Sequence, residues 1–294
     1  MDGMAPSLVG DQGEGLTAAG RAFYKMSGSG NDFVFFDVGQ EPPGSLESPA
    51  AIRAISARRT GVGADGVVFL EPRSSSEFAI RYYNSDGSLG ELCGNATLCA
   101  MRFASDRGMV SQAEVSIHTD AGVIQARMAD GLPEIDLAPV TEVKPEAAGI
   151  PRLDREELLG FARVGVPHIV IVDRDVATAD VLDRGSRIRR DPSLSDGANV
   201  NFVTASGNDW KIRTYERGVE GETLACGTGA VATGILLTEW GRATSPVGLI
   251  TRSGRRLEVT VRRRSRDSWL PSLRGPAELI FEGRLGQLDL NTGA

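Results

Sequence analysis

Two stretches of the chain follow one pattern: RYYNSDGSLGELCGN at Arg81–Asn95 and RTYERGVEGETLACGT at Arg213–Thr228. Each opens with strand-forming residues, passes through a glycine-rich turn and reaches Cys-Gly and a polar residue, where a helix is expected to begin. The two cysteines, Cys93 and Cys226, lie almost half of the chain apart. The same order of elements in both halves predicts an internal duplication and two lobes of similar fold.

Apolar periodicity places further elements around these two stretches. The expected helices span 50–59, 96–107, 178–188 and 229–240. The expected strands span 33–36, 67–70, 78–83, 113–119, 122–128, 133–137, 168–173, 199–204, 210–215, 247–250, 257–263 and 278–282. Prolines and glycines in 139–152 predict a linker between the halves. We expect a flexible tail over 1–20, a first lobe of 21–140 plus 277–294, and a second lobe of 141–276.

Composition limits the classes of protein that fit the sequence. The chain has 294 residues, 41 % of them apolar, which is enough for a core in each lobe. A net charge of −7 disfavours general binding to nucleic acid or to an anionic membrane. No apolar run reaches the roughly 18 residues of a membrane helix, and no signal peptide is recognised at the N-terminus. Three cysteines do not make a disulfide framework, so a cytoplasmic protein is expected.

A cysteine at the start of a helix is suited to a functional role. The first backbone N–H groups of a helix point outward and carry the positive end of its dipole, which binds carboxylate and favours a thiolate. Glycine after the cysteine lets a ligand approach the backbone closely. An isolated cysteine is more often a small core residue. The matching positions of Cys93 and Cys226 favour a functional pair instead.

Two thiols on opposite faces of a substrate suit the inversion of a stereocentre. One, as thiolate, removes the α-proton from one face, and the other, as thiol, returns a proton to the opposite face. The two helix starts would hold the α-carboxylate and stabilise the charge that develops as the proton leaves. This hypothesis requires neither a metal nor an organic cofactor.

Seven blocks of the sequence occur in the same order as in a known protein family. They are KMSGSGNDFVFFD at Lys25–Asp37, RRTGVGADGVV at Arg58–Val68, RYYNSDGS at Arg81–Ser88, CGN at Cys93–Asn95, VGVPH at Val164–His168, NVNFV at Asn199–Val203 and ERGVEGETLACGTGA at Glu216–Ala230. In these blocks the chain resembles the diaminopimelate epimerase family. The resemblance implies an α/β fold of two pseudosymmetric domains, each a barrel-like, mostly antiparallel sheet around a central helix. It also implies epimerisation of LL-diaminopimelate to the meso form without pyridoxal phosphate, in the biosynthesis of lysine and peptidoglycan precursors.

The resemblance further implies roles for individual residues. Cys93 and Cys226 are the expected acid and base, and His168 and Glu216 are expected to tune their pKa values. The expected substrate contacts are Asn31, Asn84, Gly94, Asn95, Asn199, Glu216, Arg217, Gly227 and Thr228. The expected partner is a small amino-acid substrate, with no cofactor, metal, nucleic acid or membrane, and a homodimer is left open.

Some positions depart from the family pattern. Ala96 and Leu98 stand where glycine and arginine usually follow the first cysteine, and Leu89 replaces a usual acidic residue. Val166 stands where many members carry an asparagine that touches substrate. None of these changes removes a proton-transfer group. They bear on substrate choice and rate more than on the type of reaction.

Other functions stay open at this point. One is racemisation of a different amino acid on the same fold, and another is a non-catalytic binding protein. A binding protein predicts the loss of at least one thiol, and both thiols are present. Phenazine-pathway isomerases share the two-lobed fold but lack the cysteine pair. The arginine-rich segment 251–267 could contact nucleic acid, but it has no aromatic residues for stacking and is more typical of a solvated hairpin.

Overall fold

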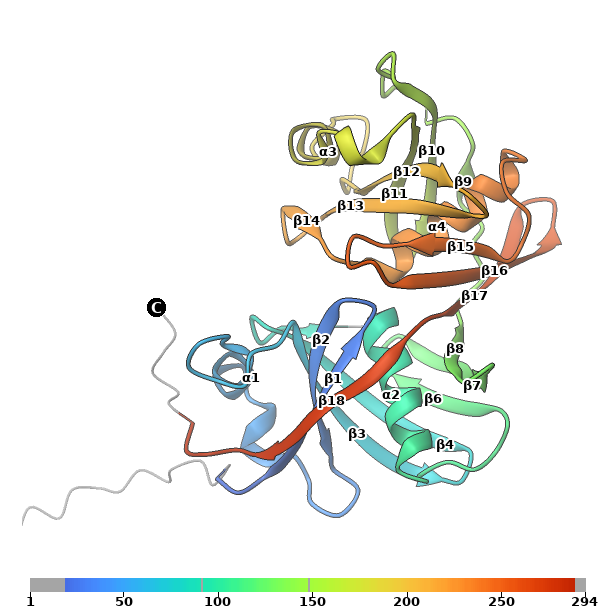
Figure 1. Ribbon diagram of the computed structural model, residues 1–294. Helices are drawn as coiled ribbons and strands as arrows, with labels where there is room; N and C mark the ends of the chain where they lie inside the picture. Colours follow the sequence, from blue (N-terminus) through green and yellow to red (C-terminus); the bar gives the residue numbers. More distant parts are fainter. Residues whose placement is uncertain (1–18, 91, 148, 289–294) are drawn as a thin grey trace, which may run out of the picture.

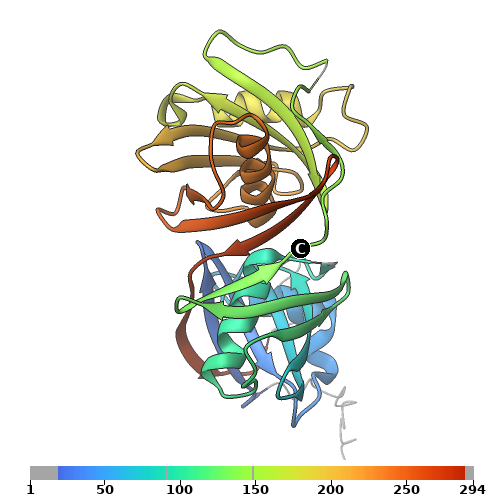
Figure 2. The ribbon, with the colours of Figure 1, turned by 90° about the vertical axis from the view of Figure 1, so that its right-hand side faces the viewer.

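The computed structural model describes residues 19–90, 92–147 and 149–288, which form two lobes stacked on one another (Figure 1). The tail expected over 1–20 lies outside the described residues, apart from 19 and 20. In each lobe a twisted, mostly antiparallel sheet curves around one long helix, as a second view shows (Figure 2). The two-domain α/β fold expected from the sequence is therefore confirmed.

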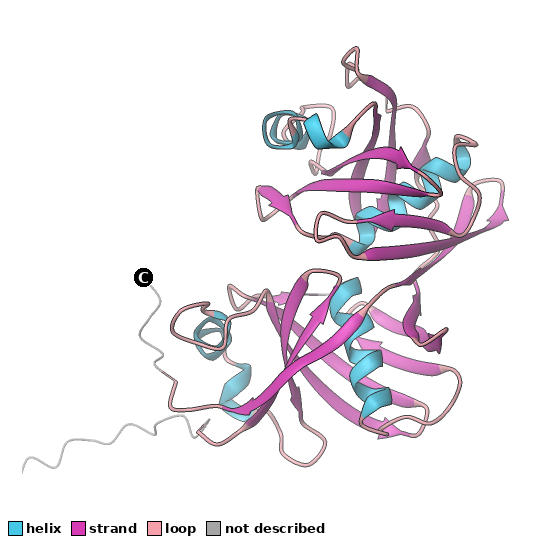
Figure 3. Ribbon diagram, viewed as in Figure 1, coloured by secondary structure: helices cyan, strands magenta, loops and turns pink. Residues whose placement is uncertain are grey.

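The lobes contain the following elements (Figures 1 and 3). The first lobe is built from η1 (Gly44–Glu47), α1 (Pro49–Ser56), α2 (Gly94–Asp106), β1 (Ala22–Gly28), β2 (Asn31–Asp37), β3 (Gly66–Ser74), β4 (Glu77–Asn84), β5 (Leu89–Gly90), β6 (Val115–Thr119), β7 (Gly122–Ala129), β8 (Leu132–Asp136) and β18 (Ala277–Arg284). The second lobe is built from η2 (Val176–Thr178), α3 (Val181–Arg189), α4 (Gly227–Glu239), β9 (Val143–Lys144), β10 (Glu156–Val164), β11 (Val166–Asp173), β12 (Asn199–Ser206), β13 (Asp209–Glu216), β14 (Gly221–Thr223), β15 (Val247–Ile250), β16 (Arg256–Ser265) and β17 (Ser268–Arg274).

The two lobes repeat one order of strand pairings. In the first lobe β2 runs parallel to β3, and β4 runs parallel to β6. In the second lobe β11 runs parallel to β12, and β13 runs parallel to β15. Parallel strands need a crossover, and the crossovers carry α1 and α2 in one lobe and α3 and α4 in the other. The structure therefore contains the duplication that the two cysteine stretches predict.

The central helices α2 and α4 are buried almost all round. Each buries ten of its thirteen residues, because a sheet wraps it on several sides. Small residues let the sheet come close: a Cβ built on Gly234 would lie only 2.8 Å from Val259 Cγ1. Close packing of this kind fixes the position of α4 inside its sheet.

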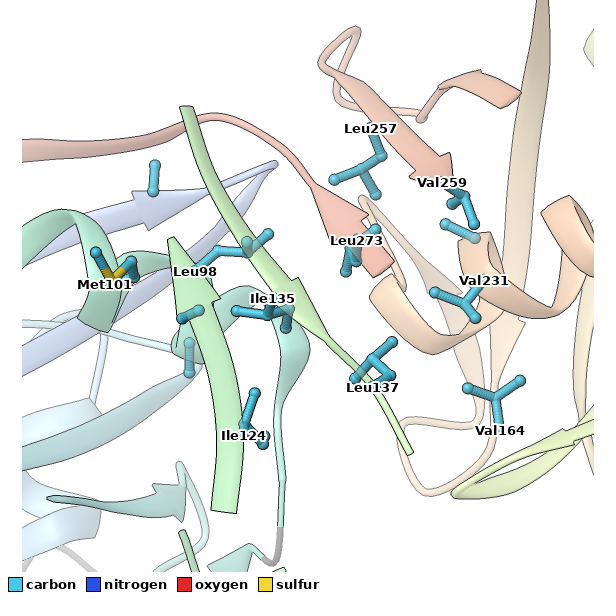
Figure 4. Close-up of a cluster of buried hydrophobic side chains, with 14 of the residues drawn as sticks. Leu98, Met101, Ile124, Ile135, Leu137, Val164, Val231, Leu257, Val259 and Leu273 are labelled. Carbon is cyan, nitrogen blue, oxygen red and sulfur yellow. The ribbon is translucent and has the colours of Figure 1, made fainter. Parts of the chain in front are cut away.

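An apolar core continues from one lobe into the other. Leu273 of β17 lies between Leu98 and Ile135 of the first lobe and Leu257 of the second (Figure 4). The strand β17 also pairs with both β16 and β8, and β18 returns to pair with β1. Leu98 is fully buried in this core. Leu98 therefore contributes to the packing between the lobes.

Candidate active site

Cys93 and Cys226 occupy matching places at the starts of the two central helices. Each is the N-cap residue, with φ −128° and ψ 112° at Cys93 and φ −134° and ψ 110° at Cys226. The helix starts face one another across the lobes, because a Cβ built on Gly227 would lie 3.8 Å from Gly94 Cα. Both cysteines are free thiols; Cys93 is partly exposed and Cys226 is buried.

The surroundings of the two thiols raise their pKa values. Burial raises the pKa of the Cys93 thiol to about 11, although the backbone N–H groups of Ala96 and Asn95 oppose the shift. Burial raises the pKa of Cys226 to about 12, with Thr228 and Gly229 opposing it. The helix starts favour the thiolates, as expected from the sequence, but desolvation of the charged form outweighs them. The net shift of both pKa values is therefore opposite in direction to the one expected from the helix starts alone.

Glu216 ends β13 and acts on both thiols. Its charge is the next factor, after burial, that raises the pKa of Cys226, and it also raises that of Cys93. Burial raises the pKa of Glu216 itself, with the nearby Thr223 side chain opposing and the charge of Asp65 adding to the shift. A cation placed near Glu216 would offset this charge and make a thiolate easier to form.

His168 is buried beside a polar network of the second lobe. Thr214 Oγ1 donates to Asn201 Oδ1 at 2.9 Å, so the Asn201 amide nitrogen faces the Ile169 carbonyl at 3.0 Å and His168 Nδ1 at 3.3 Å. His168 Nδ1 is then an acceptor, and the ring proton stands on Nε2. Among the described residues His168 Nε2 has no hydrogen-bond partner. Burial, aided by the charge of Arg217, lowers the pKa of His168 to about 3, which keeps the ring neutral.

The asparagines expected to bind substrate fall into three groups. Asn31 and Asn95 contact one another, with Asn95 Nδ2 donating to Asn31 Oδ1 at 2.7 Å. Asn84 Oδ1 accepts from the Tyr82 hydroxyl at 3.0 Å, and its nitrogen donates to Ser88 Oγ. The third group lies in the second lobe and contains Asn199.

Asn199 and Arg217 form that third group. Asn199 Oδ1 accepts from the Arg217 backbone N–H at 2.7 Å. One guanidinium nitrogen of Arg217 donates to the Asp196 carbonyl at 2.9 Å. At the start of α4, Thr228 Oγ1 lies 3.5 Å from Cys226 Sγ, and the Gly229 N–H points at the same sulfur at 3.4 Å.

Three residues of the site were not singled out from the sequence: Asp65, Tyr82 and Asn201. The Tyr82 hydroxyl lies beside the Cys93 thiol, and burial together with the nearby charges raises the pKa of this tyrosine well above its ordinary range. Asn201 packs under the start of α4, because a Cβ built on Gly229 would lie 2.2 Å from Asn201 Oδ1. All three belong to the sequence blocks that carry the family resemblance, which was the available signal.

Neither a candidate metal cluster nor a membrane-spanning helix occurs in the described part of the chain. No group of three or more His, Cys, Asp or Glu residues there could hold a metal ion. Within 19–90, 92–147 and 149–288, no helix is long and apolar enough to cross a membrane.

Comparison with known proteins identifies the family. A family model described as diaminopimelate epimerase matches residues 23–139 and 160–280. The diaminopimelate epimerase of Gemmatimonas aurantiaca is 44 % identical over 277 residues, which cover 91 % of this chain and 100 % of that protein. The diaminopimelate epimerase of Aquifex aeolicus is 40 % identical over 277 residues, which cover 90 % and 98 %.

Solved structures show how widely this fold is used. A phenazine biosynthesis protein of the PhzF family from Bacillus anthracis superposes with a TM-score of 0.71 at 14 % identity, over 90 % of this chain and 98 % of its own. A probable proline racemase from Agrobacterium radiobacter superposes with a TM-score of 0.65 at 16 % identity, over 90 % and 92 %. At these identities the likeness extends to the fold alone. The family match and the two curated relatives, in contrast, show that the chain belongs to the diaminopimelate epimerase family, a family of isomerases.

Proposed function

We propose that the protein interconverts LL- and meso-diaminopimelate by proton transfer through Cys93 and Cys226, without a cofactor. The observation that carries the proposal is the placement of two free thiols at matching N-caps of two central helices whose starts face one another. A substrate α-carbon held between these starts would meet one sulfur on each face. That arrangement is what inversion of a stereocentre requires.

The mechanism needs one thiolate and one thiol at a time. The thiolate takes the α-proton as the C–H bond breaks, and the electron pair moves toward the α-carboxylate. The opposite thiol then gives its proton to the α-carbon. At the end, the first cysteine is a thiol and the second is a thiolate. Because burial and Glu216 hold both thiol pKa values high, the thiolate has to form with the substrate in place. The α-ammonium of the substrate, near Glu216, supplies the positive charge that makes this possible.

The backbone of the two helix starts would bind the α-carboxylate. Gly94 and Asn95 on one side, and Gly227 and Thr228 on the other, present N–H groups at the positive end of a helix dipole. These donors stabilise the negative charge that builds up on the carboxylate as the α-proton leaves. Because these donors belong to helices that are packed inside the two sheets, little reorganisation would oppose the transfer.

The other polar groups would recognise the rest of the substrate. The guanidinium of Arg217 and the amides of Asn31, Asn84 and Asn199 suit the distal carboxylate and ammonium, because they supply both donors and acceptors. His168, neutral and with its Nε2 proton unpaired, would act on the thiols as a fixed dipole rather than as a charge. The reaction belongs to lysine and peptidoglycan-precursor biosynthesis in the cytoplasm.

Exchange of the α-proton tests the function directly. Reduced protein is incubated with LL-diaminopimelate in deuterium oxide, and α-deuteration and the LL-to-meso ratio are followed by NMR. We expect deuterium at the α-carbon together with inversion, and no effect of chelator or of a carbonyl reagent that traps pyridoxal phosphate. Single amino acids run in parallel test for a racemase of another substrate. Exchange into one of these, with none into diaminopimelate, would overturn the assignment of substrate.

A further inference from the structure

A chain of hydrogen bonds leads from an ion-pair cluster to the start of α2. Asn31 Nδ2 donates to Asp65 Oδ2 at 3.0 Å, and Asn95 Nδ2 donates to Asn31 Oδ1 at 2.7 Å. Asp65 Oδ1 in turn accepts from Arg58 Nη2 at 2.5 Å. The chain therefore runs from Arg58 through Asp65 and Asn31 to the residue that follows the Cys93-Gly94 pair.

Asp65 itself is held firmly. Arg58 bridges Asp65 and Asp32, with Nη2 at 2.8 Å from Asp32 Oδ1. Lys25 pairs with Asp32 at 2.7 Å. Burial alone would raise the pKa of Asp32, but the hydrogen bonds from Arg58 and Lys25 outweigh it and lower that pKa. The Asp32 backbone N–H also donates to Asp65 Oδ2 at 3.2 Å. The carboxylate is therefore fixed in place before a ligand arrives.

The direction of the hydrogen bonds is set by chemistry. An ionised carboxylate can only accept, so Asn31 has to turn its amide nitrogen toward Asp65. The Asn31 oxygen then faces Asn95, which donates a hydrogen bond to it through its own amide nitrogen. One N–H of the Asn31 amide stays available, and Asn31 is not fully buried. Asn95 Oδ1 is left buried without a partner among the described residues, beside Gly227 of the other lobe.

We infer that Asp65 is a positioning residue which makes Asn31 a hydrogen-bond donor to the substrate and fixes the Asn95 amide at the start of α2. This inference rests on the proposed function, because it takes the substrate to be the diacid. An amide without a fixed neighbour offers either its oxygen or its nitrogen. Asp65 fixes the orientation of the Asn31 amide. The first lobe therefore offers a hydrogen-bond donor, which suits an anionic group of the ligand.

The second lobe has no such pair of residues at the matching positions. Phe33 pairs with Gly66 in the first lobe as His168 pairs with Asn199 in the second. By this register Val166 stands where Asn31 stands, and Ala198 stands where Asp65 stands. Neither side chain has a polar atom. At this pair of positions, the choice between donor and acceptor is therefore enforced in the first lobe and not in the second.

Asp65 also acts on the thiol of its own lobe. Its negative charge is one of the factors that raise the pKa of Cys93, after burial and Glu216. The other titratable groups near this thiol are Tyr82 of β4, Cys226 at the start of α4, Cys99 on α2, and Asp120, which lines the same small pocket as Cys93 and Tyr82. Removing the charge of Asp65, with these groups unchanged, has to move the titration of Cys93 to lower pH.

The test compares Asp65→Asn with the wild type and with Asp136→Asn. Asp136 is a matched control, because it also accepts from an arginine, Arg127, and the exposed fractions of the two aspartate side chains are 36 % for Asp65 and 35 % for Asp136. Arg58 and Asn31 donate to different oxygens of Asp65, and Asp65→Asn keeps only one of these two oxygens. We expect kcat/KM for LL-diaminopimelate to fall roughly 10- to 100-fold, mostly through KM, as for loss of a hydrogen bond to a charged group. Asp136→Asn should keep wild-type values.

A second readout needs no substrate. The pH dependence of Cys93 alkylation by iodoacetamide, followed by peptide mass spectrometry, should move to lower pH by roughly 0.2 to 0.5 in Asp65→Asn. A wild-type KM together with an unmoved alkylation curve would overturn the inference. If Asp65→Asn does not fold, Asp65→Glu keeps the charge but displaces it. We then expect a raised KM with an unmoved curve, and a wild-type KM would overturn the positioning role.

The same measurements separate this inference from the proposed function. A wild-type protein that exchanges no α-proton of diaminopimelate refutes the function, whatever Asp65 does. The alkylation curve would still report whether Asp65 acts on Cys93. A wild-type protein that turns over normally, beside an Asp65→Asn variant that does so equally well with the same alkylation curve, refutes the inference alone.

Discussion

The two lobes present their cysteines on nearly the same backbone, but they surround them with different side chains. Cys226 has Thr228 and the Gly229 N–H within 3.5 Å of its sulfur. Cys93 makes no side-chain capping bond to its helix and lies beside the Tyr82 hydroxyl. The lobes thus share the positions that inversion requires, and they differ in the groups that adjust each thiol.

The polar networks behind the helix starts differ in the same way. The first lobe uses an acceptor-only carboxylate, Asp65, to orient Asn31. The second lobe uses a hydroxyl donor, Thr214, to orient Asn201 against His168. Each network fixes one amide, by opposite means. Duplication therefore conserved the backbone of the site, while the hydrogen-bond direction was set separately in each lobe.

Removal of either thiol is the strongest test of whether the two lobes both take part in the reaction. If the lobes act as an acid and a base, Cys93→Ala and Cys226→Ala should each lower kcat roughly 10³-fold or more, because each removes a proton-transfer group. NMR in deuterium oxide measures the rate, and Cys99→Ala is the control, since Cys99 is buried in the core of α2. A near-normal rate in either thiol variant would show that one lobe suffices.

The network of the second lobe can be broken at Asn201. Asn201→Leu leaves Thr214 and His168 without their partner, so we expect a loss of about 1–3 kcal/mol in the free energy of unfolding. We also expect kcat to fall roughly 10-fold, because His168 loses the group that fixes its tautomer. Thr214→Val removes only the donor to Asn201 and should have a smaller effect of the same sign. Denaturant unfolding and steady-state kinetics give the two numbers, and an unchanged kcat in both variants would contradict the role.

The parts of the fold and of the site that are determined by neighbouring residues could be predicted from the sequence. A Cys-Gly pair at a helix start is set by neighbouring residues, so Cys93 and Cys226 could be placed correctly. Asp65 could not be given a role, because its partner Asn31 belongs to another strand. The direction of the thiol pKa shift was wrong because burial comes from the whole fold. β17 was missed because it contains Pro271, whose carbonyl nevertheless accepts from the Leu137 N–H at 3.0 Å.

The buried histidine makes the second lobe sensitive to acid. The pKa of His168 is about 3 in the folded protein, against 6.5 for an unperturbed histidine. A lowered pKa means that the neutral ring contributes stability above pH 6.5, which is lost as the pH falls toward 3. We expect the wild type to lose about 1 kcal/mol per pH unit more than His168→Gln between pH 6 and pH 4. Parallel unfolding curves of the two proteins over this range would contradict the burial of a neutral ring.

The smallest expected effect comes from making the lobes more alike. Val166 stands at the start of β11, where the register places the counterpart of Asn31. Val166→Asn gives the second lobe an amide, but no counterpart of Asp65 fixes it, since Ala198 stands there. An amide free to turn loses part of its hydrogen-bond energy to the cost of ordering it. We therefore expect KM for diaminopimelate to fall only about 2- to 5-fold. Val166→Asn combined with Ala198→Asp should lower KM further if a carboxylate is what directs the amide, and a double variant no better than the single one would show that it is not.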